Sequence, residues 1–254
     1  MNPQIFHWPG SSRIPQLDSG EIHVWALDLD RSPMPSDWGV LGHDETVHAH
    51  RFVFPRDRDR YVRAHAAMRI LLGAYTGRPA AEIFFSHTAY GKPEIAPGQN
   101  SPHVRFNLSH SGGVGVFAAS CGHELGVDIE MVRAIDRDVA EHHFSARELL
   151  TLSSLPPEDW RHGFFRCWTS KEALLKGAGM GLNLPLDAFD VEADPKRSPA
   201  LLDFRGPASL ASGWRLTELN PAPNVVGTLA ARGEGRGETA HFNFPEVRLF
   251  AFNG

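Results

Sequence analysis

The chain has 254 residues, of which 42% are hydrophobic and 22% charged, and this balance is typical of a globular protein with a buried core. Its formal net charge of -5 excludes a protein whose whole surface binds a polyanion. The two cysteines, Cys121 and Cys167, are too few for a disulfide framework or a zinc ribbon, and we recognise no signal peptide or membrane-spanning stretch. We therefore expect a cytoplasmic protein.

The first half of the sequence alternates strand and helix patterns. Residues 21–29 alternate about Ile22, Val24 and Ala26, which predicts a strand, and residues 44–54 predict a short helix. Residues 56–75 predict a longer helix with an arginine-rich outer face. Two more strands are expected at residues 82–86 and 104–108, and the Ser-His-Ser-Gly-Gly sequence that follows is expected to break the second of them.

The second half begins after a turn near Gly122. Strands are predicted at residues 114–119 and 125–131, and helices at residues 136–144 and 158–177. The Ser-Ala-Arg-Glu sequence of residues 145–148 has the form of a capping box and predicts a further helix start. The remaining strands are expected at residues 188–191, 214–219, 225–231 and 247–252, with loops at residues 194–207 and 232–238.

Two acidic residues share one side of the predicted strand at residues 125–131. Asp128 and Glu130 are two positions apart, so their carboxylates project together while Val127 and Ile129 face the core. Adjacent carboxylates repel each other unless a cation or a proton lies between them, and magnesium prefers such oxygen ligands. Taken alone, the pair is more typical of two solvated acids on a half-buried edge strand.

A third acid lies on the longest predicted helix. Glu172 shares a helix face with Trp168 and Lys176, which alone indicates a surface ion pair worth about 0.2–0.5 kcal/mol. Close to Asp128 and Glu130, it would instead complete a metal site or act as a general base. His110, flanked by serines at the expected strand break, suits a phosphate, although a solvated loop histidine has the same pattern.

These segments, taken in order, resemble a known family. Residues 107–111 (Asn-Leu-Ser-His-Ser), 126–130 (Gly-Val-Asp-Ile-Glu) and 168–176 (Trp-Thr-Ser-Lys-Glu-Ala-Leu-Leu-Lys) resemble the three signature segments of the 4'-phosphopantetheinyl transferases. Residues 90–93 (Tyr-Gly-Lys-Pro) and 144–148 (Phe-Ser-Ala-Arg-Glu) resemble two more. The likeness covers residues 50–182, and the chain length is similar to that of the long, monomeric class typified by the surfactin-synthetase-activating enzyme.

The resemblance implies an α/β (α+β) fold of two similar lobes related by pseudo-twofold symmetry, each a small sheet packed with helices, with the active site in the cleft between them. Residues 1–121 would form the N-terminal lobe with the coenzyme contacts, and residues 122–254 the C-terminal lobe with the metal and catalytic residues. The implied reaction moves 4'-phosphopantetheine from coenzyme A to a serine of an apo acyl, peptidyl or aryl carrier protein and releases 3',5'-ADP.

The resemblance also implies a role for each site residue. Magnesium would be bound by Asp128, Glu130 and Glu172. Glu172, Lys176 and Asp128 would be catalytic, with Glu172 taking the serine proton and Lys176 neutralising the leaving phosphate. The coenzyme would be contacted by Arg60, Lys92, Ser109, His110 and, more weakly, Lys171. The family's basic residues for the 3'-phosphate have no clear match within residues 43–51, where His48 and Arg51 are the substitutes.

Two alternatives remain open from the sequence. A magnesium-dependent phosphodiesterase would use the same acids but would need a continuous basic surface, for which the arginine-rich helix is the sequence candidate. A non-catalytic module that binds carrier proteins or nucleotides would not need all three acids and both lysines. For the transferase we expect no nucleic acid or membrane partner, and a carrier docking patch either within residues 106–117 or near Arg161 and Arg166.

Overall fold

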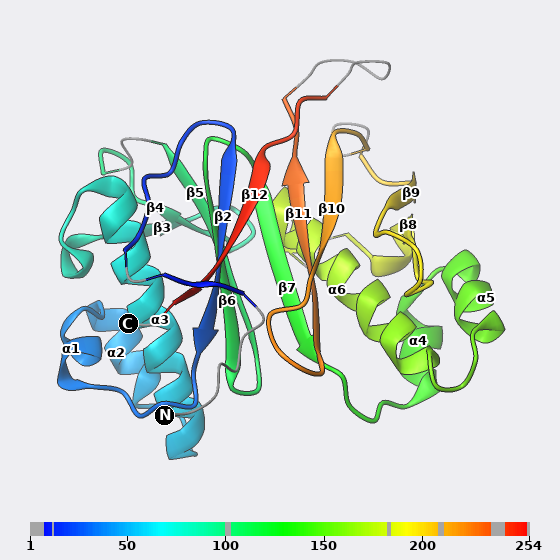
Figure 1. Cartoon of the computed structure of the whole chain (residues 1–254), viewed down its shortest axis with the longest axis horizontal. Helices are drawn as coiled ribbons and strands as arrows, with labels where there is room; N and C mark the ends of the chain where they lie inside the picture. Colours follow the sequence, from blue (N-terminus) through cyan, green and yellow to red (C-terminus); the bar gives the residue numbers. More distant parts are fainter. Residues whose placement is uncertain are drawn as a thin grey trace.

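Two sheets lie at the centre of a mixed α/β fold, and small hairpins and helices pack around them (Figure 1). The computed structural model describes residues 8–11, 13–99, 103–181, 184–207, 211–234 and 242–252. The larger sheet has the strand order β1 (Gly10–Ser11), β12 (Glu246–Phe252), β2 (Glu21–Asp28), β6 (Val114–Cys121) and β5 (Val104–Ser111). The smaller sheet has the order β10 (Trp214–Leu219), β11 (Val225–Arg232) and β7 (Leu125–Met131).

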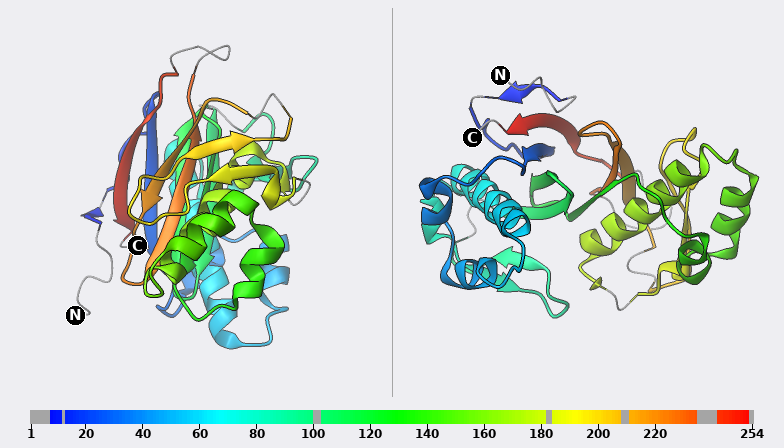
Figure 2. Two further views of the ribbon diagram at one scale, coloured as in Figure 1. Left: turned by 90° about the vertical axis from the view of Figure 1, so that its right-hand side faces the viewer. Right: turned by 90° about the horizontal axis from the view of Figure 1, so that it is seen from below.

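The helices lie on one side of these sheets, as both views of Figure 2 show. Beside the larger sheet are α1 (Pro35–Gly39), α2 (His43–Ala49), α3 (Pro55–Thr76) and the hairpin of β3 (Phe85–His87) and β4 (Pro93–Ile95). Beside the smaller sheet are α4 (Arg137–His143), α5 (Ala146–Ser154), α6 (Trp160–Ala178) and the hairpin of β8 (Phe189–Val191) and β9 (Leu201–Phe204). Short 3-10 turns occupy Ala80–Glu82 and Leu186–Ala188.

The core explains why the strand at residues 21–29 is apolar on both sides. Ile22 and its alternate neighbours pack with Val127 and Ile129 of β7, whereas Trp25 and Leu27 pack against α3. Both faces of β2 are therefore buried, one against α3 and the other against residues of the smaller sheet. The sequence predictions of β2, β7, α3 and α6 are confirmed to within two residues at each end.

Four predicted boundaries are wrong. The helix expected at residues 44–54 ends five residues early, because α2 spans His43–Ala49. β5 continues through Ser111 and does not end at Leu108. The expected strand at residues 82–86 is the end of a 3-10 turn followed by β3, and the expected loop at residues 194–207 contains β9. The loop predicted at residues 232–238 lies partly outside the described residues.

The strand β12 connects the two ends of the chain. It lies between β1 and β2, parallel to both, with Val247 opposite Ile22 and Ala251 opposite Ala26. A strand from the last part of the sequence therefore completes a sheet whose other members come from the first half. The two-lobe division at residues 121 and 122 and its symmetry stay predictions.

Candidate active site

The candidate site forms where α6 packs onto β7. Gly126 lies on the same side of β7 as Asp128 and Glu130, and a Cβ atom there would lie 2.2 Å from Ala173 O and Gly177 N of α6. The absence of a side chain at Gly126 therefore allows the helix to approach the strand closely. Thr169 and Ser170 of α6 also contact the Thr228 hydroxyl of β11, at 3.2 and 3.1 Å. These contacts fix the helix turn that carries Glu172 and Lys176 over the acidic face of β7.

Asp128 is buried at the centre of this contact. Its Oδ1 accepts a hydrogen bond from Lys176 Nζ at 2.6 Å and another from Ser109 Oγ at 3.0 Å. Burial raises the pKa of Asp128 to about 6, although Lys176 and Ser109 oppose the shift, and the nearby Glu172 adds to it. Asp128 and Lys176 thus form a partly buried ion pair between strand and helix, which joins two predicted catalytic residues.

Three side chains of β5 bind the edge of β7 that has no neighbouring strand in its own sheet. Val127 N donates to Asn107 Oδ1 at 2.8 Å, Ile129 N to Ser109 Oγ at 3.3 Å, and Met131 N to Ser111 Oγ at 3.0 Å. We call Asn107, Ser109 and Ser111 the β5 ladder. Residues 109–111 are extended because they pair with residues 114–116 of β6, and the side-chain bonds to β7 add to that pairing, so the Ser-His-Ser sequence does not end the strand as expected.

The carboxylates satisfy part of the requirement for a metal site. Burial raises the pKa of Glu172 above its usual value, Lys176 opposes this shift and the nearby Glu130 adds to it, so the acids repel one another. Asp128 Oδ2 is buried and has no hydrogen-bond partner among the described residues. No three His, Cys, Asp or Glu side chains in the described ranges are already grouped as metal ligands. The unsatisfied oxygen and the clustered acids fit a hard cation such as magnesium, whose use stays a prediction.

A cavity of about 700 Å³ lies next to the ladder, between α2, α3, β3 and β5. Its polar wall includes His43, Glu45, His48, His65 and His110. Its apolar wall includes Met68, Ile83, Phe84, Phe85 and Phe106. This volume and this mixture of apolar and polar walls are typical of pockets for small molecules and cofactors.

The predicted coenzyme contacts have different surroundings. His110 lines the cavity, and Arg60 binds Asp30, with Nη2 and Oδ1 2.6 Å apart. Lys92 Nζ donates to the carbonyl oxygens of Leu125 and Gly177, at 2.9 and 3.1 Å, and burial lowers its pKa to about 8. Lys92 therefore connects the β3–β4 hairpin to both β7 and α6. The Ser109 hydroxyl is already bound to β7 and Asp128, as described above.

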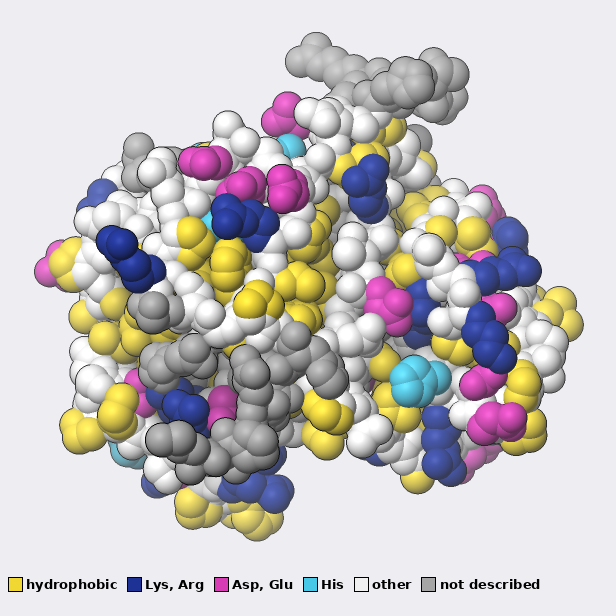
Figure 3. Space-filling view, viewed as in Figure 1, with side chains coloured by type: hydrophobic (Ala, Val, Ile, Leu, Met, Phe, Trp, Pro, Cys, Tyr) yellow, Lys and Arg dark blue, Asp and Glu magenta, His cyan; other side chains and the backbone are white. Residues whose placement is uncertain are grey.

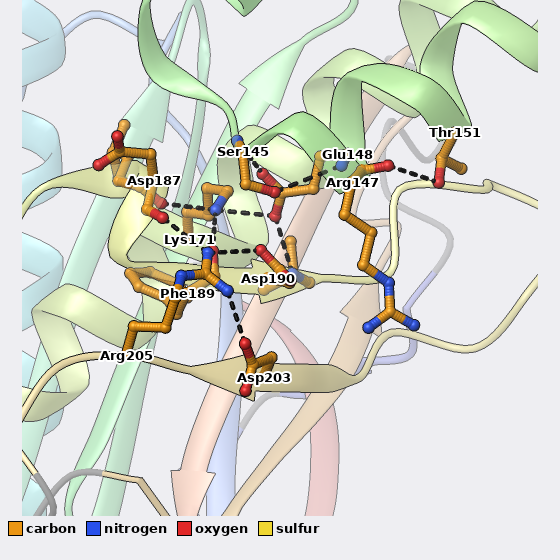
Figure 4. Close-up of polar contacts among 12 residues, drawn as sticks. Ser145, Arg147, Glu148, Thr151, Lys171, Asp187, Phe189, Asp190, Asp203 and Arg205 are labelled. Atoms are coloured by element: carbon orange, nitrogen blue, oxygen red, sulfur yellow. Dashed lines mark hydrogen bonds and ion pairs between the residues drawn. The ribbon is translucent and has the colours of Figure 1, made fainter.

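Lys171 lies in the interior, beside Glu148 and Phe189 (Figure 4). Its Nζ is 2.8 Å from Glu148 Oε1 and donates to the carbonyl oxygens of Leu186 and Phe189, both at 2.6 Å. Both charged side chains are 0% exposed. The Lys171 ammonium already donates to protein groups, and its side chain has no surface open to solvent. We therefore do not assign Lys171 to the coenzyme site, where the sequence had placed it.

Comparison with known proteins connects this geometry to a family. A model described as "4'-phosphopantetheinyl transferase superfamily" matches residues 124–227, and one described as "4'-phosphopantetheinyl transferase, N-terminal" matches residues 32–122. The 4'-phosphopantetheinyl transferase HetI of Nostoc sp. is 34% identical over 223 residues, which cover 86% of this chain and 91% of the relative. The chain belongs to the 4'-phosphopantetheinyl transferase superfamily.

Other relatives of this transferase come from Bacillus subtilis and Xenopus laevis. The 4'-phosphopantetheinyl transferase Sfp of Bacillus subtilis is 32% identical over 182 residues, covering 67% of this chain and 76% of the relative. The L-aminoadipate-semialdehyde dehydrogenase-phosphopantetheinyl transferase of Xenopus laevis is 29% identical over 187 residues, covering 67% and 57%. The predicted family and enzyme class are thereby confirmed: the chain is a 4'-phosphopantetheinyl transferase. None of its described helices is long and apolar enough to cross a membrane.

Sequence reasoning missed several residues that build the transferase's site. Asn107 and Ser111 fall within a signature segment, and their alternation with Ser109 was the signal for a strand with one polar face. Glu148 was recognised as the end of a capping box, which it is, but it also binds Lys171 and the backbone of Val191. That second role depends on β8, which is distant in sequence, and no local pattern indicates it.

Proposed function

We propose that this transferase moves the 4'-phosphopantetheine group of coenzyme A to a serine hydroxyl of an apo carrier protein. The serine oxygen attacks the phosphorus that bears the pantetheine, a new P–O bond forms, and the bond to the bridging pyrophosphate oxygen breaks. The products are the holo carrier protein and 3',5'-ADP, which leaves with the electron pair of the broken bond. The serine proton passes to a base, directly or through a water molecule.

The observation that supports this reaction best is the convergence of Asp128, Glu172 and Lys176 at the contact between β7 and α6. We assign the base to Glu172, because its raised pKa makes it a stronger proton acceptor than an ordinary surface carboxylate. We assign the neutralisation of the leaving phosphate to Lys176, whose side chain is 31% exposed and so remains accessible to a ligand. Positioning and charge neutralisation supply most of the catalysis in this type of transfer.

The divalent cation would be held by Asp128, Glu130 and Glu172, with the unpartnered Oδ2 of Asp128 as one ligand. When bound, magnesium would neutralise pyrophosphate charge and orient the reacting phosphate. Asp128 must be ionised to serve as a ligand, and the ion pair with Lys176 favours that form.

We assign the nucleotide of coenzyme A to the 700 Å³ cavity, because its apolar wall suits a base and its polar wall suits phosphates. Of the two substitutes that the sequence offered for the 3'-phosphate contact, His48 lines this cavity and Arg51 is not among its lining residues. His48 is therefore our choice, and His110 lines the same cavity from β5.

The phosphodiesterase alternative has less support. The five arginines of α3 that suggested a basic surface each form an ion pair with an acidic residue. The pairs are Arg56 with Asp57, Arg58 with Asp59, Arg60 with Asp30, Arg63 with Asp37, and Arg69 with Glu45. On the face drawn in Figure 3, the described Lys and Arg side chains are interspersed with Asp and Glu. A polymeric nucleic acid needs a continuous basic track. We propose apo carrier proteins and coenzyme A as the partners of a monomer.

The test is intact-mass spectrometry of an apo carrier protein incubated with the transferase, coenzyme A and magnesium. We expect the carrier to gain the mass of one phosphopantetheine group, to gain none when EDTA is present, and to gain it far more slowly when Glu172→Gln replaces the wild type. A gain that persists in EDTA would contradict the metal assignment alone. No gain on acyl, peptidyl and aryl carriers, with coenzyme still bound, would favour the non-catalytic module.

A further inference from the structure

The seam between the two sheets is built from side chains. β5 is the last strand of the larger sheet and β7 the last strand of the smaller, and these two edges face each other. The amides of residues 127, 129 and 131 bind side chains of residues 107, 109 and 111, in the same direction and with constant spacing. The β5 ladder thus replaces the backbone carbonyls that a neighbouring strand would normally supply.

The same contacts determine where the serine protons point. Ser111 Oγ accepts from Met131 N at 3.0 Å and lies 2.7 Å from Glu130 Oε2. Because a hydroxyl has one proton and an amide can only donate, that proton goes to the carboxylate. Ser109 has the same arrangement with Ile129 N and Asp128 Oδ1. Each serine therefore accepts from the amide after an acid and donates to that acid's carboxylate.

This repeated geometry orients the two strand acids. One oxygen of Asp128 is held toward β5 by Ser109, and the other, Oδ2, is buried without a partner in the described part of the chain. One oxygen of Glu130 is held by Ser111 in the same way. Hydrogen-bonding partners of metal-binding carboxylates restrict their rotamers and so increase metal affinity.

We propose that Ser109 and Ser111 are positioning residues that hold Asp128 and Glu130 ready to bind the divalent cation. This inference rests on the proposed function, in which these acids are metal ligands. It differs from the predicted coenzyme contact at Ser109, because it assigns the hydroxyl proton to Asp128, and it adds a role for Ser111, which the sequence did not single out.

Ser111 offers the sharper test, because Ser109 also lies 3.3 Å from Lys176 Nζ and its substitution would disturb the ion pair. Ser111→Ala removes the hydroxyl, and Ser111→Thr keeps it in a residue that suits a strand. Ser120→Ala is the matched control: Ser120 is fully buried in β6 and donates to His123 O at 2.6 Å. It loses one buried hydrogen bond in the same sheet without touching a carboxylate.

The direct readout is Mn2+ binding, followed by electron paramagnetic resonance in the presence of coenzyme A. We expect Ser111→Ala to weaken Mn2+ affinity about 10-fold, while Ser111→Thr and Ser120→Ala stay close to the wild type. In the transfer assay, Ser111→Ala should need about 10-fold more magnesium for half-maximal rate, and its kcat should recover at saturating magnesium.

The proposal is overturned if Ser111→Ala binds Mn2+ like the wild type, or if Ser120→Ala weakens binding equally. It is also overturned if Ser111→Thr is as weak as Ser111→Ala while both remain folded by circular dichroism. Should Ser111→Ala not fold, Ser109→Ala takes its place, because Ser109 donates to Asp128 in the same way, and wild-type Mn2+ binding by that variant would overturn the proposal. Failure of the proposed function has a different signature, since the wild type itself would then bind no Mn2+ or transfer without a divalent cation.

Discussion

Replacing Lys171 by methionine separates a structural role from a catalytic one. The variant removes the ammonium group and keeps most of the aliphatic side chain, so few packing contacts are lost. It leaves Glu148 charged and buried, although Ser145 N and Val191 N still donate to it at 2.9 and 2.8 Å. It also takes a hydrogen-bond donor from the carbonyl oxygens of Leu186 and Phe189.

The expected loss follows from the complete burial of both partners. Removing one member of a buried ion pair costs about 3–5 kcal/mol, because the other charge remains without compensation. For a chain of this size, that loss lowers the melting temperature by roughly 6–20 °C. Replacing both residues, by Lys171→Met with Glu148→Gln, should recover part of the loss because no unpaired charge is left.

The assay is urea denaturation of the wild type, both single variants and the double variant, with Lys196→Met as control. Lys196 forms an ion pair with Asp159 while 68% of its side chain is exposed, so its loss should barely change the midpoint. The KM for coenzyme A, measured well below the melting temperature, should stay unchanged in Lys171→Met. If Lys171→Met had wild-type stability and a raised KM for coenzyme A, the structural role of Lys171 would be refuted and its predicted contact with coenzyme A would be supported.

Three further predictions concern the site itself. Glu172→Gln should lower kcat by about 10²- to 10⁴-fold and leave the coenzyme dissociation constant, measured by calorimetry, nearly unchanged. If the variant turns over like the wild type, Glu172 is not the base. The pKa of Asp128 is raised to about 6, so protons should compete with magnesium below that pH, and the magnesium needed for half-maximal rate should be higher at pH 5.5 than at pH 7.5. An equal requirement at both values would argue against Asp128 as a ligand. Lys92→Met should cost about 1–3 kcal/mol in urea denaturation, because two carbonyl oxygens lose their donor. Since the folded pKa of Lys92 is about 8 and its ordinary value is higher, the unfolded chain binds more protons between these values, and the stability lost in the variant should grow as pH rises from 8 to 10; a pH-independent difference would contradict the assignment.

The sequence predicts well those features that depend on short-range periodicity. The alternation in residues 125–131 correctly placed Val127 and Ile129 in the core and both acids on the other side. Helical spacing likewise put Glu172 and Lys176 on one face of α6. These two elements carry the acids and the exposed lysine, but the family resemblance, and not the periodicity, named them as site residues.

The features that the sequence misjudged depend on partners distant in the chain. Arg166 was a candidate for the carrier docking patch, yet it is 4% exposed and binds Glu218 and the Pro195 carbonyl. Lys171 and Arg166 both lie on the faces of α6 that β8, β10 and their flanking loops cover, and helix periodicity does not reveal which polar partners a covering element will bring. The strand end at Leu108 was misplaced for a different reason: β5 continues to pair with its sequence neighbour β6 as far as Ser111, which lies opposite Val114.

The position of β12 has a consequence for how the protein is made. β2 emerges early during synthesis, but its neighbour β12 is translated after the whole smaller sheet. Until then, one edge of β2 offers unpaired backbone donors and acceptors to any passing strand. The half that contains the proposed coenzyme cavity therefore has to wait for the last described strand before its sheet closes. Truncating β12 would consequently impair folding of the first half of the chain, far from the carboxylates. We expect such variants to give less folded protein, while the protein that does fold keeps most of its catalytic activity.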